Sequence, residues 1–109
     1  MNEEFERYLE KFNAETRQRF TRLHELVHES TSHIIEEKLW AKLPSFYVRD
    51  RFVRIIPFND HINIEAKSIQ SHKASLDEYK ITPKGMLQIQ HTQKIPEDVL
   101  QKIMHESFE

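Results

Sequence analysis

The sequence has no cysteine, only one glycine and no long apolar run, and each absence removes a class of function. Without cysteine there can be no disulfide, no thiolate metal site and no cysteine nucleophile. A single glycine cannot build the glycine-rich loop that cradles phosphate groups in nucleotide-binding proteins. No apolar stretch approaches the roughly 20 residues that a membrane-spanning helix needs.

Neither sign of charge dominates, since 16 Lys and Arg stand against 18 Asp and Glu, for a formal net charge of −2. This balance argues against a dedicated nucleic-acid-binding protein, whose affinity depends on neutralising phosphates. A length of 109 residues fits one domain, which we place over residues 1–109. The N-terminal stretch "MNEEFERYLEKF" is acidic and amphipathic, unlike a secretory signal. We therefore expect a cytoplasmic protein that does not act in a membrane.

The first half of the chain changes from a helical to a strand pattern. Apolar residues at steps of three and four predict one long helix over residues 3–28, and a second, shorter helix follows over about 33–38. The next stretch is rich in aromatic and β-branched residues, which are typical of strands. We place three strands there, near 39–48, 52–58 and 61–66.

The second half continues with a helix predicted over residues 68–80 and a turn at 82–85, which contains the only glycine. The stretch "MLQIQ" then alternates as a short strand, and Pro96 opens a final helix. The resulting order is α-α-β-β-β-α-β-α. It predicts an α+β domain with an antiparallel-dominated sheet and helices packed on one sheet face.

Four stretches of the chain stand in a recognisable order: "EEKLWAKLPSFY", "FNDHINIEA", "LDEYKITPKGMLQI" and "KIPEDVLQKIMHESFE". Together they resemble the YdhG-like domain-of-unknown-function family of bacteria. Its members carry a Met-Pro-x-Phe stretch, a Lys-x-His turn before a strand, a Lys-Gly turn and an Ile-Pro opening to the last helix. The matching positions here are Pro44 and Phe46, His61 and Ile62, Tyr79, Lys84 and Gly85, and Ile95 and Pro96.

This resemblance implies a compact α+β fold and a binding role without catalysis. One branch of the family is described as a frataxin-like intracellular iron chaperone, which delivers iron for iron–sulfur cluster and haem assembly. The resemblance thus implies weakly bound Fe²⁺ as the cofactor and iron-accepting proteins as partners. Frataxin-type iron binding uses exposed carboxylates on a helix, and the first helix offers four at its acidic end: Glu3, Glu4, Glu6 and Glu10. The same glutamates also complement the helix dipole without any metal.

The stretch "HELVH" at residues 24–28 spells the H-E-x-x-H pattern of zinc metalloproteases. His24 and His28 share one helix face, and Glu25 stands where such an enzyme has its general base. The extended motif needs a histidine ten residues after the first, but position 34 is isoleucine. We interpret the pattern as a coincidence on the polar flank of an amphipathic helix, and we rank a zinc hydrolase below the other functions.

A simpler metal site remains open for the same histidines. Imidazole and carboxylate groups both suit iron and zinc. The possible ligands near this part of the chain are His24, His28 and His33 with Glu29, Glu36 or Glu37.

The runner-up function is a small-molecule or protein-interaction module that uses an aromatic cleft. Its ligand-binding residues, which include positions shared with the family, are Trp40, Pro44, Phe46, Tyr79 and Lys84. Aromatic residues on strands can equally belong to the core.

The stretch "YVRDRFVR" interleaves basic and aromatic residues on a predicted hairpin. Such a pattern suits single-stranded nucleic acid or an anionic ligand. The alternative is a hairpin whose outward charges block edge-to-edge pairing, and the net charge of −2 favours that alternative.

Overall fold

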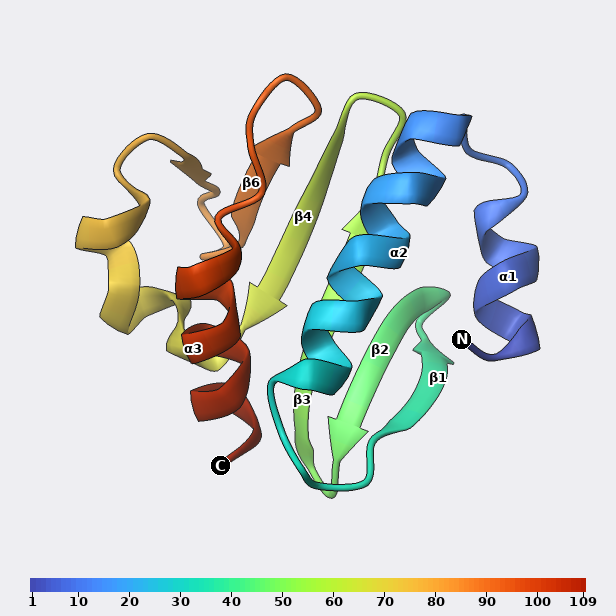
Figure 1. The fold of residues 1–109 in the computed structure, drawn as a ribbon, viewed down its shortest axis with the longest axis horizontal. Coiled ribbons are helices and arrows are strands. Elements are labelled where there is room, and N and C mark those ends of the chain that lie inside the picture. Colours follow the sequence, from blue (N-terminus) through green and yellow to red (C-terminus); the bar gives the residue numbers. More distant parts are fainter.

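A six-stranded antiparallel sheet forms the centre of the computed structural model, which describes all of residues 1–109 (Figure 1). Its strands lie in the order β1-β2-β3-β4-β6-β5. They are β1 (Glu36–Trp40), β2 (Leu43–Val48), β3 (Arg51–Pro57), β4 (His61–Ala66), β5 (Lys80–Ile81) and β6 (Leu87–Gln90). The helices are α1 (Glu3–Leu9), α2 (Ala14–Glu29), the 3₁₀ helix η1 (Lys67–Leu76) and α3 (Glu97–Phe108).

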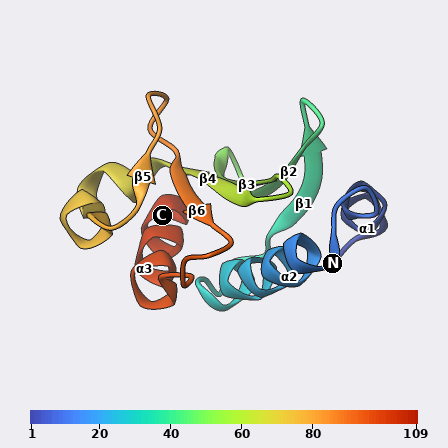
Figure 2. The same ribbon diagram turned by 90° about the horizontal axis from the view of Figure 1, so that it is seen from above.

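Helices α2 and α3 lie against one face of this sheet, and no helix covers the opposite face of β1 to β4 (Figure 2). Burial along β4 follows the same division, since Ile62, Ile64 and Ala66 are buried and the residues between them are partly exposed. Successive side chains of a strand point to opposite faces, so the buried set faces the helices. A core of 22 buried apolar residues fills the space between them. The predicted α+β architecture, with helices on one face of an antiparallel sheet, is confirmed.

The helix predicted over residues 3–28 is two helices, because α1 ends at Leu9 and α2 begins at Ala14. Asn13 begins the second helix: its backbone is extended, and its Oδ1 accepts a hydrogen bond from the Thr16 N–H at 2.9 Å. This is the usual N-cap arrangement. Asn59, in the turn between β3 and β4, holds Asn13 in place through two further hydrogen bonds. The apolar spacing continues through the break, so periodicity alone could not reveal it.

Replacing Asn13 with alanine is expected to lower the free energy of unfolding by about 1 kcal/mol, because N–H groups in the first turn of α2 lose their cap. Asn13→Ser keeps a capping oxygen and should stay within about 0.5 kcal/mol of the wild type. Urea unfolding followed by circular dichroism measures both. Equal losses for the two variants would assign the effect to the lost contacts with Asn59 and would contradict the capping explanation.

The second helix predicted over residues 33–38 is wrong, because residues 33–35 form a loop and residues 36–38 already belong to strand β1. Strands β1 and β2 form a hairpin in which Glu37 pairs with Phe46. The turn residues Ala41 and Lys42 have φ angles of 50° and 65°, the left-handed backbone of a type I′ turn. Neither is the Asn, Asp or Gly that usually marks such a turn, and the single strand predicted over 39–48 therefore runs through a turn that separates β1 from β2.

After β4 the chain forms the 3₁₀ helix η1 in place of the α-helix predicted over residues 68–80, and a non-helical residue, His72, interrupts it. The end of the predicted helix is strand β5. The predicted turn at 82–85 joins β5 to β6 and contains Gly85, whose φ is 88°. The predicted strand at 61–66 is β4, and the final helix is α3. None of the helices combines the length and apolar character that a bilayer crossing requires.

Candidate metal site

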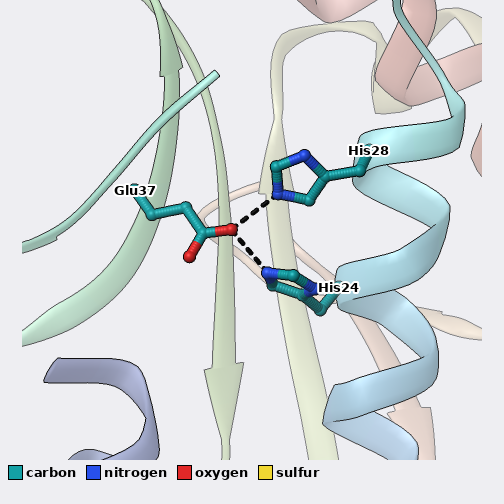
Figure 3. Close-up of side chains that lie close together, drawn as sticks. All are labelled: His24, His28 and Glu37. Atoms are coloured by element: carbon teal, nitrogen blue, oxygen red, sulfur yellow. Dashed lines mark hydrogen bonds and ion pairs between the residues drawn. The ribbon is translucent and has the colours of Figure 1, made fainter. Parts of the chain in front are cut away.

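His24 and His28 lie one turn apart on α2 and point towards strand β1 (Figure 3). Residues four apart share a helix face, and their ring centroids here are 4.6 Å apart. The neighbouring residues Leu23 and Val27 are buried in the core, which leaves the imidazoles at the rim between helix and sheet. The His24 side chain is 13% exposed and that of His28 is 42% exposed.

Glu37 on β1 completes the cluster. Its Oε2 accepts hydrogen bonds from Nε2 of His24 at 2.5 Å and from Nε2 of His28 at 2.6 Å (Figure 3). Side chains alternate along a strand, so Glu37 points towards α2 while its exposed neighbours Glu36 and Lys38 point to the other face. Only 11% of the Glu37 side chain is exposed. The sheet thus holds a carboxylate against the histidine face of α2.

The N-terminus of α1 holds the other oxygen of this carboxylate. The Asn2 backbone N–H donates to Glu37 Oε1 at 3.0 Å, and the Asn2 side-chain amide donates to the Glu37 backbone oxygen at 2.9 Å. Outer hydrogen bonds of this kind fix the orientation of a ligating carboxylate. The buried ring of Phe46 lies 5.7 Å from the His24 ring and 6.2 Å from the His28 ring, measured between centroids. No local sequence pattern links Asn2 or Phe46 to this site, because only the tertiary fold brings them there.

Burial lowers the pKa of His24 below its ordinary value, and this outweighs the opposite effect of the nearby Glu37 carboxylate. Burial alone would raise the pKa of Glu37. Hydrogen bonds from His28 and from the Asn2 N–H, together with the attraction of His24, leave the Glu37 pKa below its ordinary value. At neutral pH the site therefore combines a neutral His24 imidazole with an ionised carboxylate. These are the charge states of the two side chains that bind metal ions, and the proton on Nε2 would move to Nδ1 when Nε2 becomes a ligand.

The donor atoms of His24, His28 and Glu37 all lie within 4.8 Å of one another, and no other His, Asp and Glu side chains converge in this way. Two imidazoles and one carboxylate form the ligand set of non-haem Fe²⁺ proteins, and they also suit Zn²⁺. Metal–ligand bonds of about 2.1 Å would separate the donors by about 3 Å, so the carboxylate oxygen, which is hydrogen-bonded to the two nitrogens at 2.5 and 2.6 Å, would have to move away from them to make room for an ion.

Glu25, which a zinc peptidase with this motif would use as its general base, is turned away from the two histidines. Its carboxylate accepts a hydrogen bond from the Arg22 guanidinium at 2.9 Å. The same guanidinium pairs with Glu97 of α3 at 2.7 Å. The hydrogen bonds with Glu97 and Glu25 raise the pKa of Arg22 above its ordinary value. Glu25 is therefore engaged on the flank of α2 that faces α3, and it does not lie beside the histidines as the general base of a zinc peptidase would.

Of the three glutamates that the sequence left open as ligands, only Glu37 reaches the histidines. Glu29 pairs with an arginine of its own helix at 3.4 Å, and Glu36 pairs with the neighbouring lysine on the opposite sheet face at 3.7 Å. The third histidine, His33, pairs with Glu109 at the end of the chain at 3.1 Å. The structure thus selects one of the alternatives that the sequence offered.

The four glutamates at the acidic end do not converge on a common point. Glu3, Glu4 and Glu6 occupy the first turn of α1, Glu10 follows its last residue, and all four are exposed. Negative charge in the first turn stabilises a helix through its dipole, which accounts for three of them without a metal. Iron binding at this end of the chain stays a prediction from the family resemblance.

The residues predicted to line an aromatic cleft do not share one. Trp40 is 51% exposed on the uncovered face of the sheet, whereas Pro44 and Phe46 are buried. Phe46 faces α2 and not the Trp40 side. Tyr79 precedes β5, and its hydroxyl donates to a backbone oxygen ahead of α3 at 2.5 Å. Lys84 lies in the turn between β5 and β6 and lines a separate cleft.

Arg54 belongs to the basic and aromatic stretch, but its side chain is buried and does not lie on an exposed surface of the hairpin. Its guanidinium carbon is 4.1 Å from the ring centroid of Trp40 and 3.9 Å from that of Phe52. Its N–H groups donate to three side chains, which are the Ser45 hydroxyl, the Tyr47 hydroxyl and the Glu65 carboxylate. The inner faces of these two aromatic rings are therefore occupied by the protein's own arginine.

Comparison of the chain with protein-family models, curated proteins and solved structures found no match of any of these three kinds. The resemblance to the YdhG-like family therefore stays a prediction from the residue pattern, and the case for a function rests on the geometry of His24, His28 and Glu37.

Proposed function

We propose that the protein binds a divalent transition metal, in the first place Fe²⁺, at His24, His28 and Glu37 and passes it to an acceptor protein. The observation that carries this proposal is the convergence of the three donor atoms within 4.8 Å. Two imidazoles and a carboxylate on one side of the ion leave further coordination positions open, as in non-haem Fe²⁺ sites. The delivery role is taken from the family resemblance, and no catalytic step is part of the proposal.

Two features favour a metal that is exchanged over one that is held permanently. His28 is 42% exposed, so that an acceptor can approach the ion from that side. The hydrogen bonds of both imidazoles use Nε2, and neither Nδ1 has a protein partner. Tight sites usually hold the second ring nitrogen by a hydrogen bond, which raises the metal affinity. We therefore expect reversible binding.

An anaerobic Fe²⁺ titration of ¹⁵N-labelled protein, followed by NMR, tests the site. Saturable broadening is expected for the amides around His24, His28 and Glu37. Glu37→Gln is expected to weaken Fe²⁺ binding by at least about 100-fold, because it replaces the charged ligand by a neutral one. Glu36→Gln is the matched control. It removes the same charge from the neighbouring residue, whose side chain faces the other side of the sheet. The spectrum of each metal-free variant reports whether the fold is kept.

Three results would contradict this site. One is the absence of saturable broadening in the wild type, and the second is an equal loss of affinity in the two variants. The third is broadening confined to Glu3, Glu4, Glu6 and Glu10, which would move iron binding to the acidic end of the chain.

A further inference from the structure

A cleft of about 460 Å³ opens at the end of the sheet where β3 begins and β4 ends. The start of η1 and the turn between β5 and β6 close its other side. Its volume lies in the range of sites that hold small molecules. Neither His24, His28 nor Glu37 lines it, so it is separate from the candidate metal site.

Positive charge is concentrated in this cleft. Arg51, Lys67 and Lys84 come from three different segments, and none of them takes part in an ion pair of the structure. Of the two carboxylates on the lining, Glu65 is bound to the Arg54 guanidinium at 2.9 Å, which leaves only Asp50 to balance three cations. The chain as a whole carries a net charge of −2, so this excess is local. Like charges that share a cleft repel one another, and a bound anion removes that repulsion.

The turn between β5 and β6 is shaped to lie close against η1. Gly85 has a φ of 88°, and a Cβ atom at this position would come within 2.9 Å of Gln70 Nε2. Glycine adopts this left-handed backbone without strain. Gln70 also lines the cleft, and its side-chain amide makes no hydrogen bond within the protein. Its N–H₂ can donate to an anion beside the three cations.

Phe52 also lines the cleft, and its ring centroid lies 3.9 Å from the Arg54 guanidinium carbon. An occupant can thus combine charged oxygens, held by the lysines and the Gln70 amide, with a non-polar part placed against Phe52. A single chloride or acetate would neutralise only one of the three cations.

We propose that this cleft binds a small organic polyanion whose charge is carried by phosphate or carboxylate groups. Arg51, Lys67 and Lys84 neutralise those groups, and Gln70 donates a hydrogen bond to them. The site is independent of metal binding by His24, His28 and Glu37.

Titration of the metal-free, ¹⁵N-labelled protein at constant ionic strength, followed by NMR, tests the proposal with pyrophosphate in one series and citrate in the other. Saturable shifts are expected for the amides of Lys67, Gln70 and Gly85. Lys67→Gln and Lys84→Gln are each expected to raise the Kd by about fivefold. Lys73→Gln is the matched control, because Lys73 is an exposed lysine of η1 that does not line the cleft.

Saturation by pyrophosphate alone would assign the site to phosphate esters, and saturation by citrate alone to polycarboxylates; both results support the proposal. It is overturned if neither anion saturates the shifts by about 10 mM, or if Lys73→Gln weakens binding as much as the cleft variants do. Glu37→Gln should leave anion binding unchanged, so that failure here and failure of the metal site can be told apart.

Discussion

Replacing Phe46 with alanine is expected to lower the free energy of unfolding by about 3 to 5 kcal/mol, because the ring is fully buried and leaves a cavity. The ring packs edge-on against Phe5 at a centroid distance of 5.3 Å and lies behind both imidazoles of the candidate metal site. The change therefore removes part of the core and the wall behind His24 and His28. Urea unfolding measures the first effect, and the Fe²⁺ titration of the folded variant measures the second.

Phe58→Ala is a suitable control, because Phe58 is 40% exposed. Its replacement should change the free energy of unfolding by less than about 1 kcal/mol. If Phe46→Ala does not fold, Phe46→Leu fills more of the cavity and should lose less stability than the alanine variant while still weakening Fe²⁺ binding. A loss below about 1 kcal/mol for Phe46→Ala would contradict its place in the core.

Replacing Arg54 with alanine is expected to lower the free energy of unfolding by about 3 kcal/mol. The change removes a guanidinium that is packed between Trp40 and Phe52 and leaves the Glu65 carboxylate without its partner. Because Glu65 is itself 37% exposed, water can take over part of that interaction, and the loss should stay at the lower end of the range for broken buried ion pairs. Trp40 is the only tryptophan, so its fluorescence reports directly on the loss of the stack.

Arg49→Ala is the matched control for Arg54→Ala. Arg49 is exposed and makes no ion pair, so its replacement should change the stability by less than about 0.5 kcal/mol. Arg54→Lys keeps the charge but not the planar arrangement of N–H groups. Its loss of stability should lie between those of Arg54→Ala and Arg49→Ala. If Arg54→Lys is as stable as the wild type, the stacking and the three directed hydrogen bonds do not account for the contribution of Arg54 to the free energy of unfolding.

The helices and strands that the sequence predicted well are those with a strong local pattern. The strand predicted over residues 61–66 from its β-branched residues is β4, and Pro96 marks the start of α3. The break before α2 was missed because the apolar stripe continues across it. Asn13 is the residue that could have revealed the break, since asparagine is a favoured N-cap.

The hairpin of β1 and β2 was the more consequential error. Its turn uses Ala41 and Lys42 at positive φ, and neither residue carries the usual signature of such a turn. The helix predicted over residues 33–38 left Glu37 without a defined direction. Only the pairing of Glu37 with Phe46 turns the carboxylate towards α2. The third member of the candidate metal site was therefore visible in the sequence only as one of three possible glutamates.

By itself, the sequence determined the α+β class, the antiparallel sheet and the common face of His24 and His28, because these depend on local spacing and on the period of a helix or strand. The tertiary structure alone decided that Glu37 joins the two histidines, that Glu25 turns to Arg22, and that the predicted aromatic residues are dispersed. It also brought three cations from distant segments to one cleft. Those outcomes depend on cross-strand pairing and on contacts between segments far apart in the chain, for which local spacing carries no signal.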